Sequence, residues 1–155
     1  MKKTAVAVCA VLVVALLVGV VVAATASQDI TSPRTITVIE KETQGHFVDV
    51  GRRGPSLGDQ FVFSGLLLQN GTTVGHDGGH CIFVHRHPTQ AECEATFKLP
   101  GGKITAQALL HLGNGPQTFD IAVNGGTSVF RNARGQATIQ ELGQNRSKIT
   151  FHLIP

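Results

Sequence analysis

The sequence contains no tyrosine, no tryptophan and few charged residues. Charged side chains make up 15% of its 155 residues, and the formal net charge is only +3. Lys2 and Lys3 supply much of that small surplus from the extreme N-terminus. The remainder of the chain is close to neutral and lacks the basic surface that attracts phosphate backbones. A nucleic-acid partner is therefore not expected.

Several catalytic motifs are also missing. There is no Gly-x-Ser-x-Gly elbow, so a serine hydrolase triad cannot be argued. The Gly125-Gly126 pair is followed by neither a lysine nor the start of a helix, which argues against a nucleotide-binding loop. Beyond the N-terminal segment no stretch repeats apolar residues with helical spacing. These absences leave an all-β domain as the predicted fold class.

The first 26 residues have the features of a signal peptide. Two lysines precede an uncharged apolar run over residues 4–24, and Ala24-Thr25-Ala26 forms a small-x-small processing site. We predict cleavage before Ser27 and secretion of the rest of the chain. The run is close to the length that spans a bilayer, so an uncleaved N-terminal membrane anchor is the alternative. Residues 27–34 are polar and end near a proline, which predicts a disordered lead-in to one domain over residues 35–155.

Cysteine usage is consistent with export. Of three cysteines, Cys9 lies in the leader, which leaves Cys81 and Cys93 as an even pair. An oxidising compartment favours a disulfide between them. Two buried free thiols are the alternative.

The rest of the chain alternates short β-type runs with strong turn signals. Asn-Gly and Pro-Gly-Gly steps separate runs rich in β-branched and aromatic residues. The predicted strands are residues 35–42, 60–68, 73–75 leading to 81–85, 92–99, 103–112, 118–123, 136–142 and 148–154. Regular short strands of this kind favour a sandwich or a closed antiparallel barrel. Eight strands would close a barrel with a packed interior or room for one small apolar ligand.

Three ordered motifs resemble the allene oxide cyclase and dirigent family. Residues 56–63 (SLGDQFVF) are similar to its "LGD..PF" segment, and residues 74–81 (VGHDGGHC) to its "iGitaGlC" segment. Residues 121–135 (IAVNGGTSVFRNARG) are similar to the dirigent "iavvGGTGxFrxARG". The resemblance extends over residues 35–155. It implies an eight-stranded antiparallel barrel with an apolar cavity, often a homotrimer, that guides a small molecule through cyclisation or radical coupling by holding it in one reactive conformation.

Departures from the family motifs argue against the plant cyclase activity itself. The signature "NERDRGSP" is replaced by residues 40–45 (EKETQG), and Gly65 stands where the cyclases have a polar asparagine. Cys81 takes the place of a cavity cysteine, but a disulfide would remove its thiol. The tyrosines of the family's active sites have no counterpart here. A different cyclisation, or ligand binding alone, fits better.

The resemblance also provides candidate site residues. Arg134 matches the arginine of the dirigent "ARG" motif, with Asp59, Asp120 or Glu40 as its carboxylate partner. The candidate catalytic groups are Arg134, Glu40 and Asp59. A structural role in the turn after Phe130 is the alternative for Arg134. The candidate ligand-binding residues are Phe61, Phe63, Phe83 and Phe130. No cofactor is expected.

Two other functions remain open. His85, His87 and Glu92 resemble the first half of a cupin metal motif, although its second half is missing. His76 and His80, in what looks like a flexible glycine-rich loop, could join such a site. The other alternative is a structural or interaction barrel with a filled interior.

Overall fold

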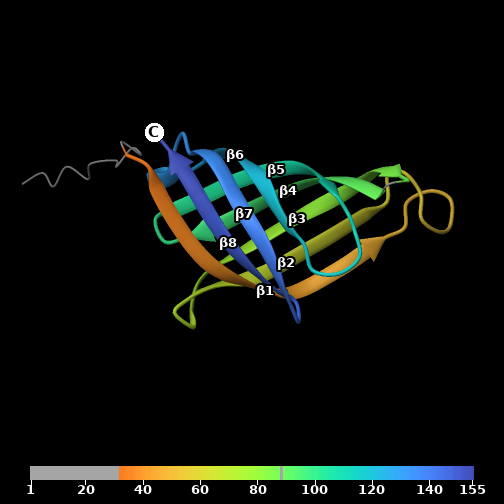
Figure 1. The fold of residues 1–155 in the computed structure, drawn as a ribbon, viewed down its shortest axis with the longest axis horizontal. Helices are drawn as coiled ribbons and strands as arrows, with labels where there is room; N and C mark the ends of the chain where they lie inside the picture. The colour runs from red at the N-terminus through yellow and green to blue at the C-terminus, as the bar shows by residue number, and fades with distance from the viewer. Residues whose placement is uncertain (1–31, 88) are drawn as a thin grey trace, which may run out of the picture.

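The computed structural model describes residues 32–87 and 89–155, which form a closed barrel of eight strands (Figure 1). The strands are β1 (Arg34–Val48), β2 (Gln60–Gln69), β3 (Thr72–Arg86), β4 (Thr89–Leu99), β5 (Gly102–His111), β6 (Thr118–Gly126), β7 (Arg134–Gly143) and β8 (Arg146–Ile154). The prediction of an all-β, eight-stranded antiparallel barrel is confirmed. The predicted leader and residues 27–31 of the lead-in lie outside the described residues. Within the described ranges, no helix has the length and apolarity needed to cross a membrane.

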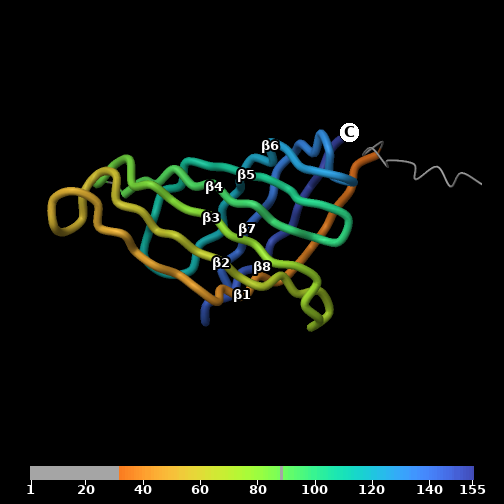
Figure 2. The backbone as a smooth tube through the Cα atoms, turned by 180° about the vertical axis from the view of Figure 1, so that it is seen from behind, coloured from red at the N-terminus to blue at the C-terminus, as the bar shows by residue number. Residues whose placement is uncertain are grey.

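Each strand pairs with its neighbour in the sequence, and β1 also pairs with β8 to close the barrel. Closure removes both sheet edges, which is the feature that distinguishes a barrel from a sandwich. Side chains alternate between interior and exterior, as β4 illustrates with buried Ala91, Cys93, Phe97 and Leu99. Figure 2 shows that the loop between β1 and β2 projects beyond the barrel at the end far from the C-terminus.

The third strand differs from the prediction. β3 continues without interruption through the glycine-rich stretch, so His76 and His80 lie in a strand and not in a flexible loop. Glycine is needed there because the neighbouring strands approach closely. A Cβ on Gly79 would lie 2.7 Å from the Phe63 ring and 3.0 Å from the Cα of Ala95. The glycines therefore permit close packing of β3 and do not mark a loop.

The first strand is also longer than predicted. It continues beyond residue 42 to Val48 after a register shift between Glu42 and Gln44. Such a bulge bends a strand and changes the direction of the side chains that follow. Because this stretch is polar, the sequence did not predict that the strand continues through it. The added residues place Phe47 at the wall of the cavity described below.

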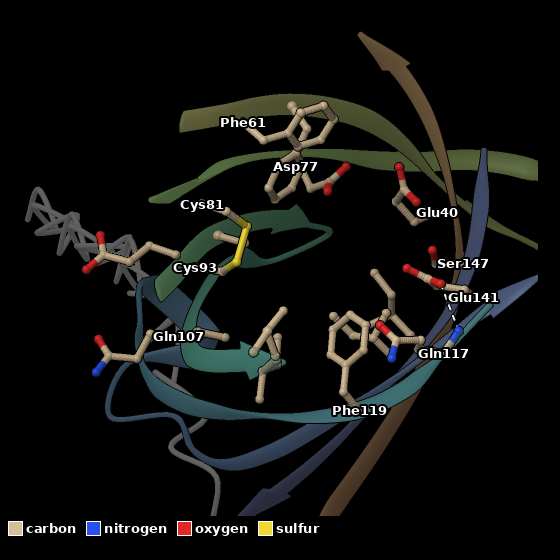
Figure 3. Close-up of a pocket in the computed structure, with 18 of the residues that line it drawn as sticks. Glu40, Phe61, Asp77, Cys81, Cys93, Gln107, Gln117, Phe119, Glu141 and Ser147 are labelled. Atoms are coloured by element: carbon tan, nitrogen blue, oxygen red, sulfur yellow. Dashed lines mark hydrogen bonds between the residues drawn. A yellow bond between two sulfur atoms is a disulfide. The ribbon is translucent and has the colours of Figure 1, made fainter. Parts of the chain in front are cut away.

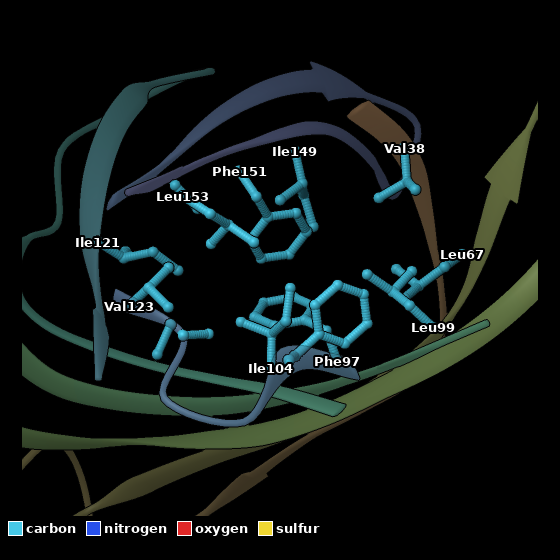
Figure 4. Packing of buried hydrophobic residues seen from close by; sticks show 14 residues of the cluster. Val38, Leu67, Phe97, Leu99, Ile104, Ile121, Val123, Ile149, Phe151 and Leu153 are labelled. Carbon is cyan, nitrogen blue, oxygen red and sulfur yellow. The ribbon is translucent and has the colours of Figure 1, made fainter. Parts of the chain in front are cut away.

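Buried hydrophobic side chains fill one end of the barrel (Figure 4). Phe97 and Phe151 meet there edge to face, with ring centroids 5.1 Å apart. A short 3-10 helix, η1 (Ser128–Phe130), follows β6 at this end and buries Phe130 in the same cluster. Phe130, a candidate ligand-binding residue, therefore lies in this core.

Cys81 and Cys93 form a disulfide, as the sequence predicted. Their sulfurs are 2.03 Å apart, and the two residues face each other across the β3–β4 ladder. The bridge therefore ties the two strands together beside the cavity.

Removing this bridge should destabilise the barrel. We expect the double variant Cys81→Ala/Cys93→Ala to lose about 2–4 kcal/mol of unfolding free energy, because a short cross-link restricts the unfolded chain. Urea unfolding of the variant and of oxidised wild-type protein measures the difference. Reduction of the wild type should reproduce the loss and leave the variant unchanged; equal stability of all samples would contradict the prediction.

Candidate functional site

The other end of the barrel interior contains a cavity of about 310 Å³ (Figure 3). This volume is enough for one small organic molecule. The inward-facing lining residues include Glu40, Glu42, Phe47, Phe61, Phe63, Asp77, Cys81, Phe83, Cys93, Leu110, Phe119, Ile139, Glu141 and Ser147. They come from β1, β2, β3, β4, β5, β6, β7 and β8, so the cavity belongs to the barrel as a whole.

Phenylalanine rings form much of the cavity wall. Phe47 and Phe83 meet edge to face with centroids 5.8 Å apart, and Phe61 and Phe63 stack at 6.2 Å. Phe119 lies on a different part of the wall (Figure 3). Such walls bind flat apolar molecules by burying their surface and stacking on their faces.

Two buried carboxyl groups interrupt this apolar surface. Glu40 on β1 is 8% exposed and Asp77 on β3 is 5% exposed. Both face Gly65 of β2, where a Cβ would lie 2.9 Å from Asp77 Oδ1 and would collide with Glu40 Oε1. The missing side chain of Gly65 therefore makes the space that both carboxyl groups occupy. Asp77 Oδ1 is buried and has no hydrogen-bond partner within residues 32–87 and 89–155.

The surroundings of this pair favour the protonated forms. Burial, followed by repulsion from Asp77 and Glu42, raises the pKa of Glu40 from 4.5 to about 7, although a hydrogen bond with Ser147 opposes the shift. Burial raises the pKa of Asp77 from 3.8 to about 6, against stabilising contacts with the backbone of Asp77 and Gly65. Near neutral pH the pair is therefore poised to give or accept a proton, which is the property required of a general acid or base.

Three further acids belong to the cavity lining, and of these Glu94 on β4 is exposed. Glu42 follows Glu40 on the inner side of β1, and Glu141 lies on β7. Glu141 Oε2 accepts a hydrogen bond of 2.8 Å from the backbone N–H of Gln117. Among the described residues, no lysine or arginine lines the cavity. The wall is thus apolar with an excess of acidic groups.

The structure brings together some of the sequence-predicted residues and separates others. Glu40, Phe61, Phe63 and Phe83 line the cavity together with the disulfide. The candidate catalytic group Arg134 is exposed and donates hydrogen bonds to the backbone carbonyl of Pro155, so it is not part of the cavity wall.

Asp59 also lies outside the cavity. Its carboxylate accepts hydrogen bonds from the backbone N–H groups of Val50 (2.9 Å) and Ser56 (2.6 Å), which hold its pKa below the usual range. These bonds close the loop between β1 and β2. Its backbone carbonyl accepts a further hydrogen bond from the N–H of Phe83, which joins the loop to β3.

The residues proposed for the metal-binding alternative do not form a cluster of metal ligands in the described part of the chain. His85 and His87 are exposed near the end of β3, and Glu92 lies on β4. No group of three histidine, cysteine, aspartate or glutamate side chains among residues 32–87 and 89–155 is arranged to hold a metal ion.

The sequence interpretation missed Asp77, Glu42 and Phe47 as site residues. Asp77 shares the inward parity of Gly75, Gly79 and Cys81, so treating the glycine-rich stretch as a strand would have placed it inside the barrel. Glu42 and Phe47 lie on either side of the β1 bulge, where simple alternation fails.

Solved structures of the same shape fall into several functional classes. A pyocyanin demethylase is 32% identical, with a TM-score of 0.69, and the match covers 77% of this chain and 99% of that chain. The pterocarpan synthase dirigent protein GePTS1 is 15% identical (TM-score 0.60; 78% and 87% covered). The exo-specific intermolecular Diels-Alderase AbnU is 14% identical (TM-score 0.61; 79% and 98% covered). The last two similarities show the fold alone.

No curated protein is similar enough in sequence to count as a relative. A family model does match, the allene oxide cyclase barrel-like domain, over residues 34–152. The match includes all three motifs that carried the resemblance in the sequence. The chain belongs to the allene oxide cyclase barrel-like family.

Proposed function

We propose that this protein binds a small, mostly apolar molecule inside the barrel and exchanges a proton with it through the Glu40–Asp77 pair. The observation that carries the proposal is the phenylalanine-lined cavity of about 310 Å³ with two buried carboxyl groups in its wall. A filled interior, as in a purely structural barrel, would leave no such space.

The chemistry follows from this combination. Rigid walls hold a flexible ligand in one conformation, and this positioning lowers the barrier to ring closure or coupling. A carboxyl group poised near neutral pH can protonate or deprotonate the bound molecule in the same step. The favoured activity is therefore a guided cyclisation, coupling or isomerisation of the ligand.

Pyocyanin is the first ligand to test, because a pyocyanin demethylase is 32% identical over nearly its whole length. A flat phenazine suits walls made of phenylalanine rings. Demethylation of the same ligand is the second candidate function. Mass spectrometry of pyocyanin after incubation with the protein shows whether the methyl group is lost. This measurement tests demethylation separately from binding.

A cavity-filling variant tests whether binding takes place inside the barrel. Leu110 lines the cavity, whereas its neighbour Leu109 is 53% exposed. We expect Leu110→Trp to weaken pyocyanin binding at least about tenfold, a loss of about 1.4 kcal/mol, because the indole occupies the ligand's space. Leu109→Trp makes the same change outside and should bind as the wild type does. Calorimetric titration measures both, and equal affinity of the two variants would contradict the proposal.

We also propose that the protein is exported, on the basis of the N-terminal segment. The charged start, the apolar run and the Ala24-Thr25-Ala26 site support cleavage before Ser27. Intact-mass measurement of the protein recovered from the culture medium should give a chain that begins at Ser27. A chain retained in the membrane with Met1 present would favour the anchor.

A further inference from the structure

The charged groups that face the cavity are almost all acidic. β1 contributes Glu40 and Glu42, β3 contributes Asp77, and β7 contributes Glu141. The other titratable residues of the lining are Glu94 on β4, which is exposed, and His111 at the end of β5, which shares a 2.7 Å hydrogen bond with Gln90. The described lining residues on β2, β6 and β8 are apolar or uncharged at the inner wall. The potential inside is therefore negative wherever these acids ionise.

Asp77 provides independent evidence that a ligand belongs here. Its Oδ1 atom is buried, lines the cavity region and has no hydrogen-bond partner among the described residues. Leaving a buried polar atom unpaired is costly, and native proteins seldom do so without a functional reason. A ligand that carries a positive charge or an N–H donor would supply the missing partner.

The aromatic wall favours the same class of ligand. The faces of phenylalanine rings carry partial negative charge and attract cations within about 6 Å of the ring centre. Phe47, Phe61, Phe63 and Phe83 line the same cavity as the carboxyl pair. Apolar burial, cation–π attraction and carboxylate pairing thus select for the same molecule.

We propose that the ligand of this cavity is a flat organic cation, such as an aromatic amine or an N-alkylated heteroaromatic ring, held between the phenylalanine rings and the Glu40–Asp77 pair. The inference rests on the proposed small-molecule function and deepens it by naming the ligand class. A neutral molecule of the same shape that has no N–H donor fills the same space but leaves Asp77 Oδ1 unpaired.

Proton release should accompany binding of the cation. Glu40 faces Asp77 and Glu42, and Asp77 also interacts electrostatically with His76 on its own strand. Since both carboxyl groups hold protons more tightly than usual, a cation must displace a proton to pair with them. The affinity for a cation should therefore rise between about pH 5 and about pH 8, the range in which the pair ionises.

The test compares two probes that differ in charge and hardly in shape, N-methylquinolinium and 1-methylnaphthalene. Titration of the full chain at about pH 8 should show the cation binding at least about tenfold more tightly. Glu40→Gln and Asp77→Asn should each remove most of this preference, so that each variant binds the two probes with similar affinity. Asp120→Asn is the matched control, because Asp120 is exposed on β6 and bonded to Thr138 at 2.6 Å.

The outcomes separate the two proposals. Equal binding of both probes, or tighter binding of the neutral probe, overturns the inference and leaves the proposed small-molecule function standing. Binding of neither probe, nor of pyocyanin, overturns the proposed function and the inference with it. The pH series uses the wild type alone, so it remains a test even if a substitution prevents folding. Cation affinity that fails to rise with pH overturns the inference.

Discussion

Phe151→Ala should lower the free energy of unfolding by about 3–5 kcal/mol, the usual cost of removing a buried aromatic side chain. Phe151 is 0% exposed and packs against Phe97 at the filled end of the barrel. Domains of this size are stable by only about 5–15 kcal/mol, so this loss is a large fraction of the total. Urea denaturation followed by circular dichroism measures the change.

Phe47→Ala is the matched control for this prediction. Phe47 also lies on a strand, but it is 45% exposed at the wall of the cavity. The same substitution removes less buried surface there and should cost less than half as much. Similar losses for the two variants would mean that the core is not confined to the η1 end of the barrel.

Glu40→Gln should stabilise the protein by about 2–3 kcal/mol at about pH 8 and have little effect at about pH 4. The folded state raises the pKa of Glu40 from 4.5 to about 7. The folded protein therefore binds this proton more tightly than the unfolded chain does. The resulting stability is fully present below about pH 4.5 and is lost as the pH rises through 7. Glutamine mimics the protonated group at every pH and so escapes that loss.

Urea unfolding of wild type and variant across this pH range checks the prediction. Asp77, whose pKa is raised to about 6, should add a pH dependence of the same sign in both proteins. Asp120→Asn removes an exposed carboxylate and should leave the pH profile of the wild type unchanged. A Glu40→Gln variant less stable than the wild type at about pH 8 would show that the ionised carboxylate has a stabilising partner.

The predictions for Phe151 and Glu40 concern opposite ends of the barrel interior. The sequence alone did not show which inward-facing residues lie at the filled end and which lie at the cavity. Alternation places Phe61, Phe63, Phe97 and Phe151 on the inside, but it says nothing about height along the barrel axis. Strand tilt and register decide which rings stack into the core and which face the cavity. Phe130 shows the consequence, since a ligand-binding role was predicted and the structure places the ring in the core.

The Glu40–Asp77 pair is a second case in which the sequence pattern did not show which residues meet inside the barrel. Glu40 was a candidate because of the family resemblance, while Asp77 was hidden in a stretch taken for a loop. Gly65 was noticed only as a departure from the family pattern, yet its missing side chain makes room for both carboxyl groups. No local pattern relates three residues on three strands, because only the pairing of β2 with β1 and β3 brings them together.

The amino-acid sequence was enough to predict the fold class and the family of this protein, and to favour the disulfide between Cys81 and Cys93. Local signals suffice for these properties: strand-like runs between strong turns, motifs in a fixed order, and an even pair of cysteines. The tertiary structure decided where the interior is filled and where it is hollow, and which acids share the hollow. Those properties depend on strand register, on the bulge in β1 and on the pairing of β1 with β8. Each of these involves residues that are distant from one another in the sequence.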